Sequence, residues 1–262
     1  MIAERLLEGR LPVFIGFFVV LLIAESLWSA RTWHDGRLKR LGFHASLSIF
    51  NTVVYWLTVS APLIVWTRHV HEQGWGISGL LGLSGPAEIA LSLVVLDLFD
   101  YGWHRANHFV PFLWRFHRSH HVDTHVDVTT SMRFHIGELL LSAAVKCLWV
   151  VVWGPSLAAF ILLEAGVTAY AQFHHSNIDL PDSVERVVRW VHMTPRLHAA
   201  HHTVGLRTRD ANYSTIFLWW DFLFGTFREA DYSEMRRLGI KEGRRSDLNL
   251  GAFLKSPFVI GP

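Results

Sequence analysis

Apolar residues along this chain gather in long blocks instead of being dispersed as in a soluble protein. A block of about 18 or more residues is long enough to cross a bilayer as a helix. Three such blocks run over Leu11–Trp28, Phe43–Trp66 and Ala87 to about Trp103. Two more, Gly137–Val152 and Pro155–Phe173, are separated by a Trp-Gly-Pro break and predict two spans or a re-entrant hairpin. The pattern predicts an all-α, polytopic membrane protein with about four to five membrane helices.

The segments outside these blocks mark the ends of the expected helices. Residues 1–10 predict a short interfacial helix and not a signal peptide, because the apolar run that follows is long and lacks a small-residue cleavage site. Glu25 is expected near the membrane interface. Gly74–Pro86 is rich in glycine and predicts a turn region with a shallow interfacial segment. No internal repeat or second domain is visible, so we expect a single membrane-embedded domain over residues 1–262.

Basic residues predict the orientation of the chain. The linker Arg31–Arg40 and the stretch after the third block are rich in arginine or lysine, whereas Arg68–Pro86 contains one arginine. The positive-inside rule therefore places the linker, that stretch and the C-terminal region in the cytoplasm. Five crossings with an outside N-terminus satisfy this assignment. We expect a multi-pass integral membrane protein, as in a bacterial inner membrane, with a cytoplasmic histidine-rich helical cap.

Composition excludes several functional classes. A formal net charge of +2 on 262 residues gives no support for a nucleic-acid partner. Cys147 is the only cysteine, which excludes an intramolecular disulfide and any cysteine-based zinc or iron–sulfur site. The unusual residue is histidine, with 17 copies, most of them in a few short clusters.

The spacing of the clustered histidines predicts shared helix faces. Residues i, i+3 and i+4 of an α-helix lie on one face. A His-His pair, His174 and His175, follows the last apolar block, where a polar residue is unremarkable. The three predicted faces are made by His104 and His108, by His117, His120 and His121, and by His198, His201 and His202.

Histidine faces of this kind indicate metal binding. Imidazole is a common ligand of iron, copper, nickel and zinc. One transition-metal ion takes about four to six ligands, so eight imidazoles predict two ions. Packing alone explains the two HxxHH segments poorly, because unpaired polar groups near a bilayer are costly.

Carboxylates on the same helix faces are expected to orient the rings. At about 100° per residue, Asp97, His104 and His108 lie within roughly 40° of one another. Asp97 is then placed to accept the second N–H of a ligating ring. The other candidates for this role are Asp100, one turn before His104, and Glu164, on the face of His175.

These acidic residues have a second interpretation. Asp97 and Asp100 have the alternative of buried ion pairs with Arg105 or Arg115. Lys146 and Glu25 are expected to extend their charges toward the membrane interface.

Two familiar metal patterns are missing from the sequence. The zinc-peptidase motif HExxH does not occur. The Glu-x-x-His ligands of soluble di-iron bundles are almost absent as well. An all-nitrogen site just under a membrane surface instead suits a substrate whose reactive carbon belongs to an acyl, alkyl or sterol skeleton.

The ordered motifs resemble the fatty acid hydroxylase/sterol desaturase superfamily. The resemblance covers about residues 97–227, roughly half of the chain, and the combination in this order is highly specific. The matching segments are Asp97-Leu-Phe-Asp-Tyr-Gly-Trp-His104-Arg-Ala-Asn-His108, Leu113-Trp-Arg-Phe-His117-Arg-Ser-His120-His121, Arg133-Phe-His135-Ile-Gly-Glu138, His175-Ser-Asn177, Thr194-Pro-Arg-Leu-His198-Ala-Ala-His201-His202, Asp210-Ala-Asn212-Tyr213 and Trp220-Asp221-Phe-Leu-Phe-Gly225-Thr226-Phe227.

The resemblance implies a helical membrane fold, a cytoplasmic di-metal site and dioxygen-dependent hydroxylation or desaturation with electrons from a redox partner. It makes His175 the preferred ligand over His174, with Asn177 as a supporting residue. Some members have a further histidine where this chain has Tyr170 and Ala171, so nine ligands are expected instead of ten. The nine are His104, His108, His117, His120, His121, His175, His198, His201 and His202.

His135 stands apart from these nine. It is either an additional ligand or a structural link between elements, because Arg-x-His-x-x-Glu suits both roles.

We therefore predict a membrane non-haem di-iron oxygenase that hydroxylates or desaturates a C–H bond of a lipid-like substrate, such as a fatty acyl, sterol or ether lipid. Its cofactors are two iron ions (Fe²⁺), with dioxygen as co-substrate. Electrons come from a donor such as ferredoxin or a b-type cytochrome with its reductase, since no nucleotide-binding GxGxxG occurs. A basic surface either docks an acidic donor or reflects the ordinary positive-inside charge of a cytoplasmic region. It is made by Arg186, Arg189, Arg207, Arg209, Arg236, Arg237, Arg244 and Arg245.

Two other functions are compatible with clustered histidines. One is a zinc-dependent membrane hydrolase, for which Glu138 is the only acid available as a base. The other is a bis-histidine haem electron-transfer subunit, which needs single histidines that face each other across helices.

Overall fold

The computed structural model describes residues 2–33, 36–229, 232–241 and 248–259. Asp35, Arg244 and Arg245, which figured in the predicted linker and basic surface, lie outside the described residues. The described chain is all-helical, with isolated β-bridges as its only strand-like pairing. This confirms the predicted fold class.

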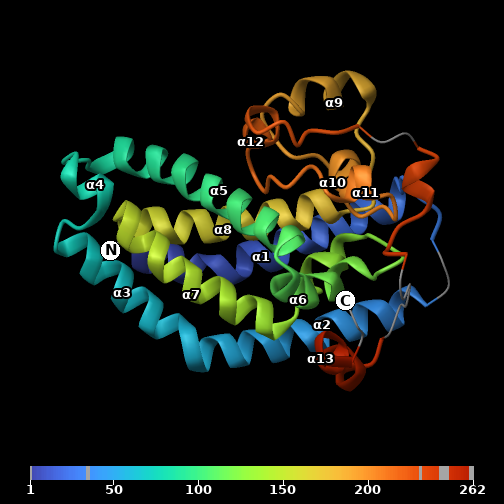
Figure 1. The fold of residues 1–262 in the computed structure, drawn as a ribbon, viewed down its shortest axis with the longest axis horizontal. Coiled ribbons are helices and arrows are strands. Elements are labelled where there is room, and N and C mark those ends of the chain that lie inside the picture. Colours follow the sequence, from blue (N-terminus) through green and yellow to red (C-terminus); the bar gives the residue numbers. More distant parts are fainter. Residues whose placement is uncertain (1, 34–35, 230–231, 242–247, 260–262) are drawn as a thin grey trace.

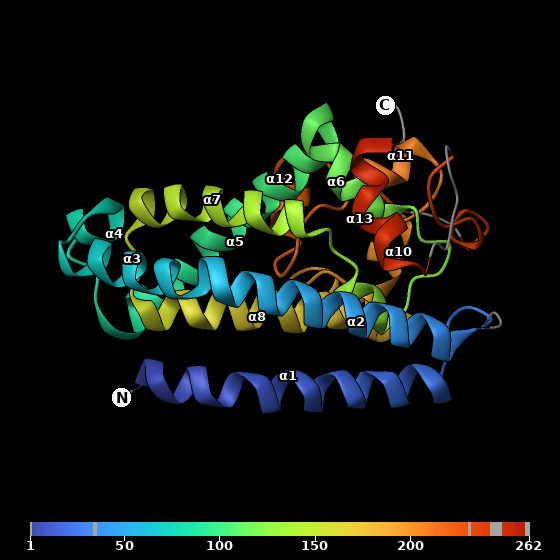
Figure 2. The ribbon, with the colours of Figure 1, turned by 90° about the horizontal axis from the view of Figure 1, so that it is seen from below.

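Five long helical rods run back and forth along the long axis of the molecule (Figures 1 and 2). The second rod is continuous through a π-helical turn, and α1 lies along one side of the bundle, packed against α8. The rods are α1 (Ile2–Leu27), α2–α3 (Arg37–Tyr55, Trp56–Ser60 and Ala61–Glu72), α5 (Gly85–Phe109), α7 (Ile136–Trp153) and α8 (Leu157–His175).

Among the described residues, three helices are long and apolar enough to cross a membrane, at Arg37–Leu80, Ile136–Trp153 and Leu157–His175. These contain the predicted second span and both halves of the predicted hairpin. Leu11–Leu27 is a shorter apolar helix. Residues 2–10 do not form the separate interfacial helix expected from the sequence, because they continue into α1 without a break. The single proline of this helix, Pro12, does not divide it.

Short helices cover one end of the bundle and form the cap seen beside α10 in Figure 1. The opposite end carries the short α4 (Gly76–Leu80), within the predicted turn region. The cap helices are α6 (Pro111–His121), η2 (Val128–Met132), α9 (Asp182–Val188), α10 (Pro195–His201), α11 (Leu206–Arg209), α12 (Trp219–Leu223), η3 (Glu234–Arg236) and α13 (Leu250–Val259).

Small apolar clusters hold the rods together, while their outer faces stay apolar and exposed. Leu63 of α3, Val150 of α7 and Phe160 of α8 belong to one buried cluster. On the outside, Val53 and Trp56 are exposed. Exposed apolar side chains on long helices are the surface that a bilayer covers.

Two glycines allow the α3–α4 connection to touch the turn between α7 and α8. A Cβ atom on Gly154 would lie 1.9 Å from the carbonyl oxygen of Trp75. A Cβ atom on Gly76 would lie 2.5 Å from the carbonyl carbon of Trp153. Both glycines also have positive φ, a region that other residues rarely adopt. The backbone at the predicted Trp-Gly-Pro break is thus in close contact with the backbone of the α3–α4 connection.

Glu25 joins three parts of the chain instead of extending to the membrane interface. Its side chain is fully buried. One carboxylate oxygen accepts hydrogen bonds from the backbone N–H groups of Val128 and Asn177, each at 2.9 Å. The other lies 3.1 Å from Arg37. The expectation for Glu25 was wrong because buried N–H groups of the cap need an acceptor at this depth.

A second buried ionic contact ties α2 to the loop that leads from α6 to α7. Arg40 forms a bidentate pair with Asp123, at 2.6 and 3.0 Å, and reaches Asp127 at 3.2 Å. Asp123 is fully buried, and the adjacent Arg40 guanidinium lowers its pKa despite the opposing effect of burial. The loop is thereby fixed beside the last turn of α6.

Replacing Glu25 should destabilise the whole protein, because Glu25→Ala leaves two buried N–H groups without an acceptor. We expect a loss of about 1–3 kcal/mol for each, measured as a lower thermal unfolding midpoint in lipid nanodiscs. The control is Glu72→Ala, which changes an exposed residue at the end of α3. Equal midpoints for the two variants would contradict this role of Glu25.

Candidate metal centre

Four helices bring the clustered histidines together in the cap. The first histidine group contains His104, His108, His117, His121 and His201. The second histidine group contains His120, His175, His198 and His202. These nine residues are the nine that the sequence predicted as ligands.

Helices α6 and α10 each contribute to both groups. In α6, the i and i+4 residues His117 and His121 belong to the first group, and His120 belongs to the second. In α10 the assignment is the opposite: the i residue His198 belongs to the second group, and His201 belongs to the first. The HxxHH spacing thus makes each helix a bridge between the groups.

The ring nitrogens within each group lie close enough to share one ion. One ligand atom per residue can be chosen so that all of them lie within 4.8 Å of one another. Two nitrogens bound to one transition-metal ion at about 2.1 Å can be no more than about 4.2 Å apart. The observed spread is therefore near the size of a single coordination sphere.

Hydrogen bonds to backbone carbonyls fix which nitrogen of several rings carries the proton. His120 Nδ1 lies 3.1 Å from the Arg133 carbonyl, and His175 Nδ1 lies 2.7 Å from the Ala171 carbonyl. A carbonyl oxygen only accepts, so each Nδ1 is the donor. In a neutral imidazole the Nε2 atom then carries a free lone pair.

These lone pairs face one another in the second histidine group. His120 Nε2 lies 3.0 Å from His175 Nε2, which lies 2.9 Å from His198 Nε2. The Nε2 atoms of His120 and His175 are both acceptors, and two acceptors at this distance repel each other unless a cation lies between or beside them. The donor set therefore fits a bound metal ion.

The first histidine group is oriented in the same way. His104 Nδ1 donates to the Tyr213 carbonyl at 2.7 Å, and His201 Nδ1 donates to the Ala211 carbonyl at 2.6 Å. The Nε2 atoms of His108 and His201 are buried and have no hydrogen-bond partner among the described residues. Buried nitrogens without a partner are rare in folded proteins and indicate a missing ligand.

Burial keeps the rings neutral. It lowers the pKa of His120, His121 and His201 well below the ordinary value, and the neighbouring histidines lower it further. Neutral imidazole is the form that binds metals. The centre thus offers uncharged nitrogen donors in a dry environment.

Two carboxylates that the helix-face analysis did not select support ring nitrogens. Glu138 Oε1 lies 2.8 Å from His117 Nδ1, and Asp210 Oδ1 lies 3.2 Å from His108 Nδ1. Glu138 lies on α7 and Asp210 just after α11, so neither shares a helix with its histidine. The matched segments Arg133–Glu138 and Asp210–Tyr213 were the only sequence signal for them.

Comparison with known proteins identifies the family. The model of the family described as fatty acid hydroxylase matches residues 89–226, more than half of the 262 residues. The chain belongs to the fatty acid hydroxylase family. All nine histidines of the two groups lie within the matched region.

Relatives of this fatty acid hydroxylase family member act on several kinds of lipid, as their names state. Ornithine lipid hydroxylase OlsE of Rhizobium tropici is 27% identical over 70% of this chain and 52% of its own length. Delta(7)-sterol-C5(6)-desaturase of Nicotiana tabacum is 25% identical over 89% of this chain and 88% of its own. Alkylglycerol monooxygenase of Xenopus tropicalis is 27% identical over 52% of this chain and 30% of its own length.

The chain thus spans about half the length of the ornithine lipid hydroxylase and nearly all of the sterol desaturase. No solved structure matches it significantly.

Asp97 does not support a histidine, contrary to the sequence prediction. Its carboxylate accepts from the backbone N–H groups of Ile216 and Phe217, at 3.1 and 3.0 Å, and from the Trp220 indole at 2.9 Å. Asp97 precedes His104 by seven residues, or about 10 Å along the helix. The two share a face but lie at different depths, and Asp97 anchors the start of α12 instead.

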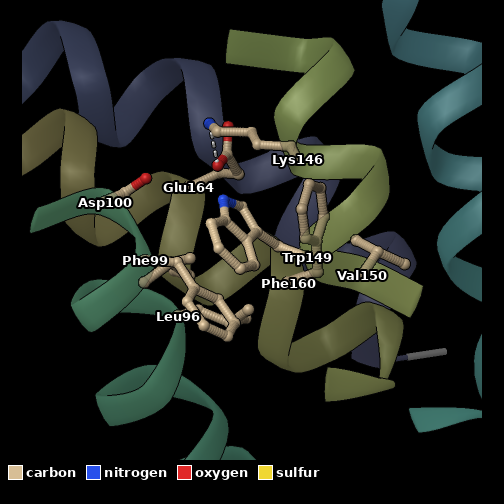
Figure 3. Close-up of a pocket in the computed structure, with 9 residues that line it drawn as sticks. Leu96, Phe99, Asp100, Lys146, Trp149, Val150, Phe160 and Glu164 are labelled. Atoms are coloured by element: carbon tan, nitrogen blue, oxygen red, sulfur yellow. Dashed lines mark hydrogen bonds and ion pairs between the residues drawn. The ribbon is translucent and has the colours of Figure 1, made fainter. Parts of the chain in front are cut away.

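Asp100 and Glu164 also lie away from the histidine groups, in a small pocket among α5, α7 and α8 (Figure 3). Glu164 pairs with Lys146 at 2.5 Å. Asp100 points toward this pair, and one of its oxygens has no hydrogen-bond partner in the described structure. The predicted support of His175 by Glu164 and the predicted extension of Lys146 to the interface were both wrong, because these charges neutralise each other inside the bundle.

Asn177 supports the chain entry to the cap instead of a histidine. Its side chain accepts from the Arg31 backbone N–H at 3.0 Å and donates to the Arg31 carbonyl at 2.9 Å. Together with Glu25, this pair of bonds fixes the end of α8 against the chain that leaves α1.

His135 and His174 lie outside both groups. His135 Nδ1 accepts from the Gly137 N–H at 2.9 Å, and its Nε2 donates to the Leu254 carbonyl at 3.1 Å. Both nitrogens are used, so His135 is the structural link that was the alternative interpretation. His174 packs against His198, with ring centroids 3.9 Å apart, but its nitrogens do not converge with either group.

Glu138 and Asp97 are predicted to fail in different ways when replaced. Glu138→Ala should lower metal affinity about 10- to 100-fold, because the His117 ring loses its orienting acceptor. Asp97→Ala should lower the unfolding midpoint and leave the metal affinity of the folded fraction unchanged. Titration against a competing chelator, with unfolding curves, separates the two effects. A loss of metal affinity in Asp97→Ala would restore the role that the sequence suggested.

Proposed function

We propose that this protein is a membrane di-iron oxygenase that hydroxylates or desaturates a C–H bond of a lipid-like substrate. The single observation that supports it best is that the imidazole nitrogens of the nine histidines converge in two groups, with the Nε2 atoms of His120 and His175 only 3.0 Å apart. The proposed ligands are the five residues of the first histidine group and the four of the second.

Two ferrous ions in these groups supply the redox chemistry that activates dioxygen toward an unreactive C–H bond. The protein holds the ring nitrogens in place through the carbonyls of Arg133, Ala171, Ala211 and Tyr213. Because the rings are buried and preorganised, they exclude water and need little rearrangement to bind metal. No nucleophile or general acid is required of the chain.

The lipid nature of the substrate rests on the relatives and on the membrane helices. Hydroxylation and desaturation both occur among the relatives, on ornithine lipids, sterols and alkylglycerols by their names. The exposed apolar faces of the rods would place the cap at the bilayer surface. A substrate that resides in the membrane can then reach the centre without crossing water.

The proposed topology is a single domain with five crossings and a cytoplasmic cap. The five rods alternate in direction along the long axis, which is the order that five crossings require. All histidine groups lie at the end that also carries the basic linker.

The proposed electron donor is a ferredoxin or a b-type cytochrome with its reductase. Arg207, Arg236 and Arg237 are exposed on the cap, whereas Arg189 pairs with Glu229 and Arg209 with Asp210. A donor with an acidic surface fits the exposed cations.

The two alternatives make different demands on the same residues. A haem between two histidines needs room for the macrocycle, but facing rings such as His120 and His202 have centroids 4.7 Å apart. A zinc hydrolase needs a carboxylate base on the bound water, whereas one oxygen of the Glu138 carboxylate orients the His117 ring.

The decisive experiment combines metal analysis with dioxygen dependence. We expect two iron ions per chain and a lipid product that gains one oxygen or loses two hydrogens, detected by mass spectrometry of lipid extracts. Strict anaerobiosis should abolish the product. Full turnover without dioxygen, or activity restored by zinc alone, would overturn the oxygenase proposal in favour of a hydrolase.

Two buried histidines of the cap provide a matched pair of variants. His120→Ala should lose metal and product while membrane insertion is retained, because His120 belongs to the second histidine group. His135→Asn should keep both, since asparagine also accepts hydrogen bonds at a helix N-terminus. Metal content and product yield of the two purified variants test this difference. Normal turnover by His120→Ala would refute the ligand assignment.

A further inference from the structure

A pocket on α5 lies on the outer side of the first histidine group. It has a volume of about 350 Å³, is open to the outside, and is lined by Gly102, Arg105, Ala106 and Phe109. Ligand pockets in proteins start at about this size. Its lining alternates along α5 with the ligand candidates, because Arg105 follows His104 and Phe109 follows His108.

The rim of this pocket is apolar and exposed, which suits a lipid chain. Phe109 is 59% exposed, and Phe112 at the start of α6 is 55% exposed. On the other side, Phe224 stacks on Tyr101 with ring centroids 5.3 Å apart. Phe109 and Phe112 thus provide exposed aromatic surface at the C-terminal end of α5 and the start of α6.

Arg105 gives the pocket a positive charge. It hydrogen-bonds the Tyr101 hydroxyl, and its guanidinium lies 5.7 Å from the centroid of the Phe109 ring. Within the described parts of the chain, no carboxylate lies in ion-pair contact with it. A guanidinium beside apolar surface favours a planar anionic partner, such as a carboxylate or a phosphate.

Tyr213 separates the pocket from the first histidine group. Its ring centroid lies 6.2 Å from Phe109 on the pocket side. On the other side it lies 5.1 Å from His108 and 5.7 Å from His201. The Tyr213 side chain is fully buried, and its hydroxyl has no hydrogen-bond partner among the described residues. An unpartnered buried hydroxyl is free to bond an incoming ligand.

We propose that this pocket is the entry subsite for a lipid with an anionic head group, which Arg105 binds and which Tyr213 separates from the histidines. The role of the pocket as a substrate subsite rests on the proposed function, but binding of the lipid can be measured without catalytic activity. The polar end of the lipid lies at Arg105, and the Tyr213 ring lies between Phe109 of the pocket and His108 of the first histidine group.

Photolabelling tests the pocket without metal, dioxygen or turnover. The full chain in nanodiscs is irradiated with hexadecanoic acid that carries a diazirine, and separately with the corresponding neutral alcohol. Mass spectrometry then locates the labelled peptides. We expect the acid to label the segment 102–112 about ten-fold more than the alcohol does. Equal labelling by the two probes, or labelling elsewhere, overturns the proposal.

Gly102 allows the pocket to be filled without damage to the fold. A Cβ atom on Gly102 meets nothing within 4 Å, and leucine is a better helix former than glycine. Gly102→Leu should therefore fold at least as well and lose most labelling by the acid. The matched control is Gly42→Leu, at a helical glycine of α2 with equally open surroundings. Unchanged labelling in Gly102→Leu contradicts the subsite.

The charge and the barrier are tested separately. Arg105→Gln should lose the preference for the acid and keep labelling by the alcohol, whereas the exposed Arg236→Gln should change neither. Tyr213→Ala should extend labelling to the peptide that contains His198–His202, and Tyr213→Phe should not. If Tyr213→Ala does not fold, Tyr213→Leu replaces it. If labelling stays on α5 in Tyr213→Ala or Tyr213→Leu, the Tyr213 ring is not the barrier between the pocket and the histidines.

The outcomes also distinguish this inference from the proposed function. An active, dioxygen-dependent enzyme whose probe attaches away from α5 overturns the pocket alone. A labelled pocket in a protein without dioxygen-dependent turnover overturns the oxygenase proposal alone.

Discussion

The packing of neutral imidazoles nitrogen to nitrogen is the constraint on which the rest of the cap depends. His175 Nε2 lies within 3.0 Å of the Nε2 atoms of both His120 and His198, and burial keeps the His120 and His198 rings uncharged by lowering their pKa. Such an arrangement repels itself in the absence of a cation. The fold must therefore hold the rings from behind. For His104, His120, His175 and His201 it does so through backbone carbonyls, which leave one tautomer possible for each neutral ring.

The carbonyls are in turn fixed by buried charges that connect the cap to the rods. Arg133, which offers its carbonyl to His120, donates to the Ser119 carbonyl at 3.1 Å and packs over Phe253 of α13. The loop before it is held to α2 by Arg40 and Asp123. Asp221 performs the same task behind Tyr213, accepting from its N–H at 2.9 Å. Asp123 and Asp221 thus act on the histidine groups at one remove, through the backbone.

Sequence reasoning predicted the rods from the apolar blocks and eight of the nine histidines from their spacing along one helix, whereas His175 was chosen through the resemblance to the family. It failed for Asp97 and Glu164, which share a face with a histidine but lie two or more turns away from it. The helix-face argument compares the directions of side chains around the helix axis, but not their positions along that axis. Glu138 and Asp210 were missed for the opposite reason, since they reach their histidines from other elements and only tertiary packing brings them there. Glu25 was misplaced because the two N–H groups that it accepts from lie more than 100 residues away along the chain.

The interior of the bundle bears on how a lipid reaches the centre. Between α5, α7 and α8, the Phe99 and Trp149 rings stack 4.0 Å apart and the Lys146–Glu164 pair fills the polar part of the space. The cavity left there is about 10 Å³, room for about one water molecule. An acyl chain cannot lie in it without breaking a buried ion pair, which is costly. The proposed entry subsite is consistent with this filled interior, because the larger pocket and the exposed Phe109 lie on the outer face of α5.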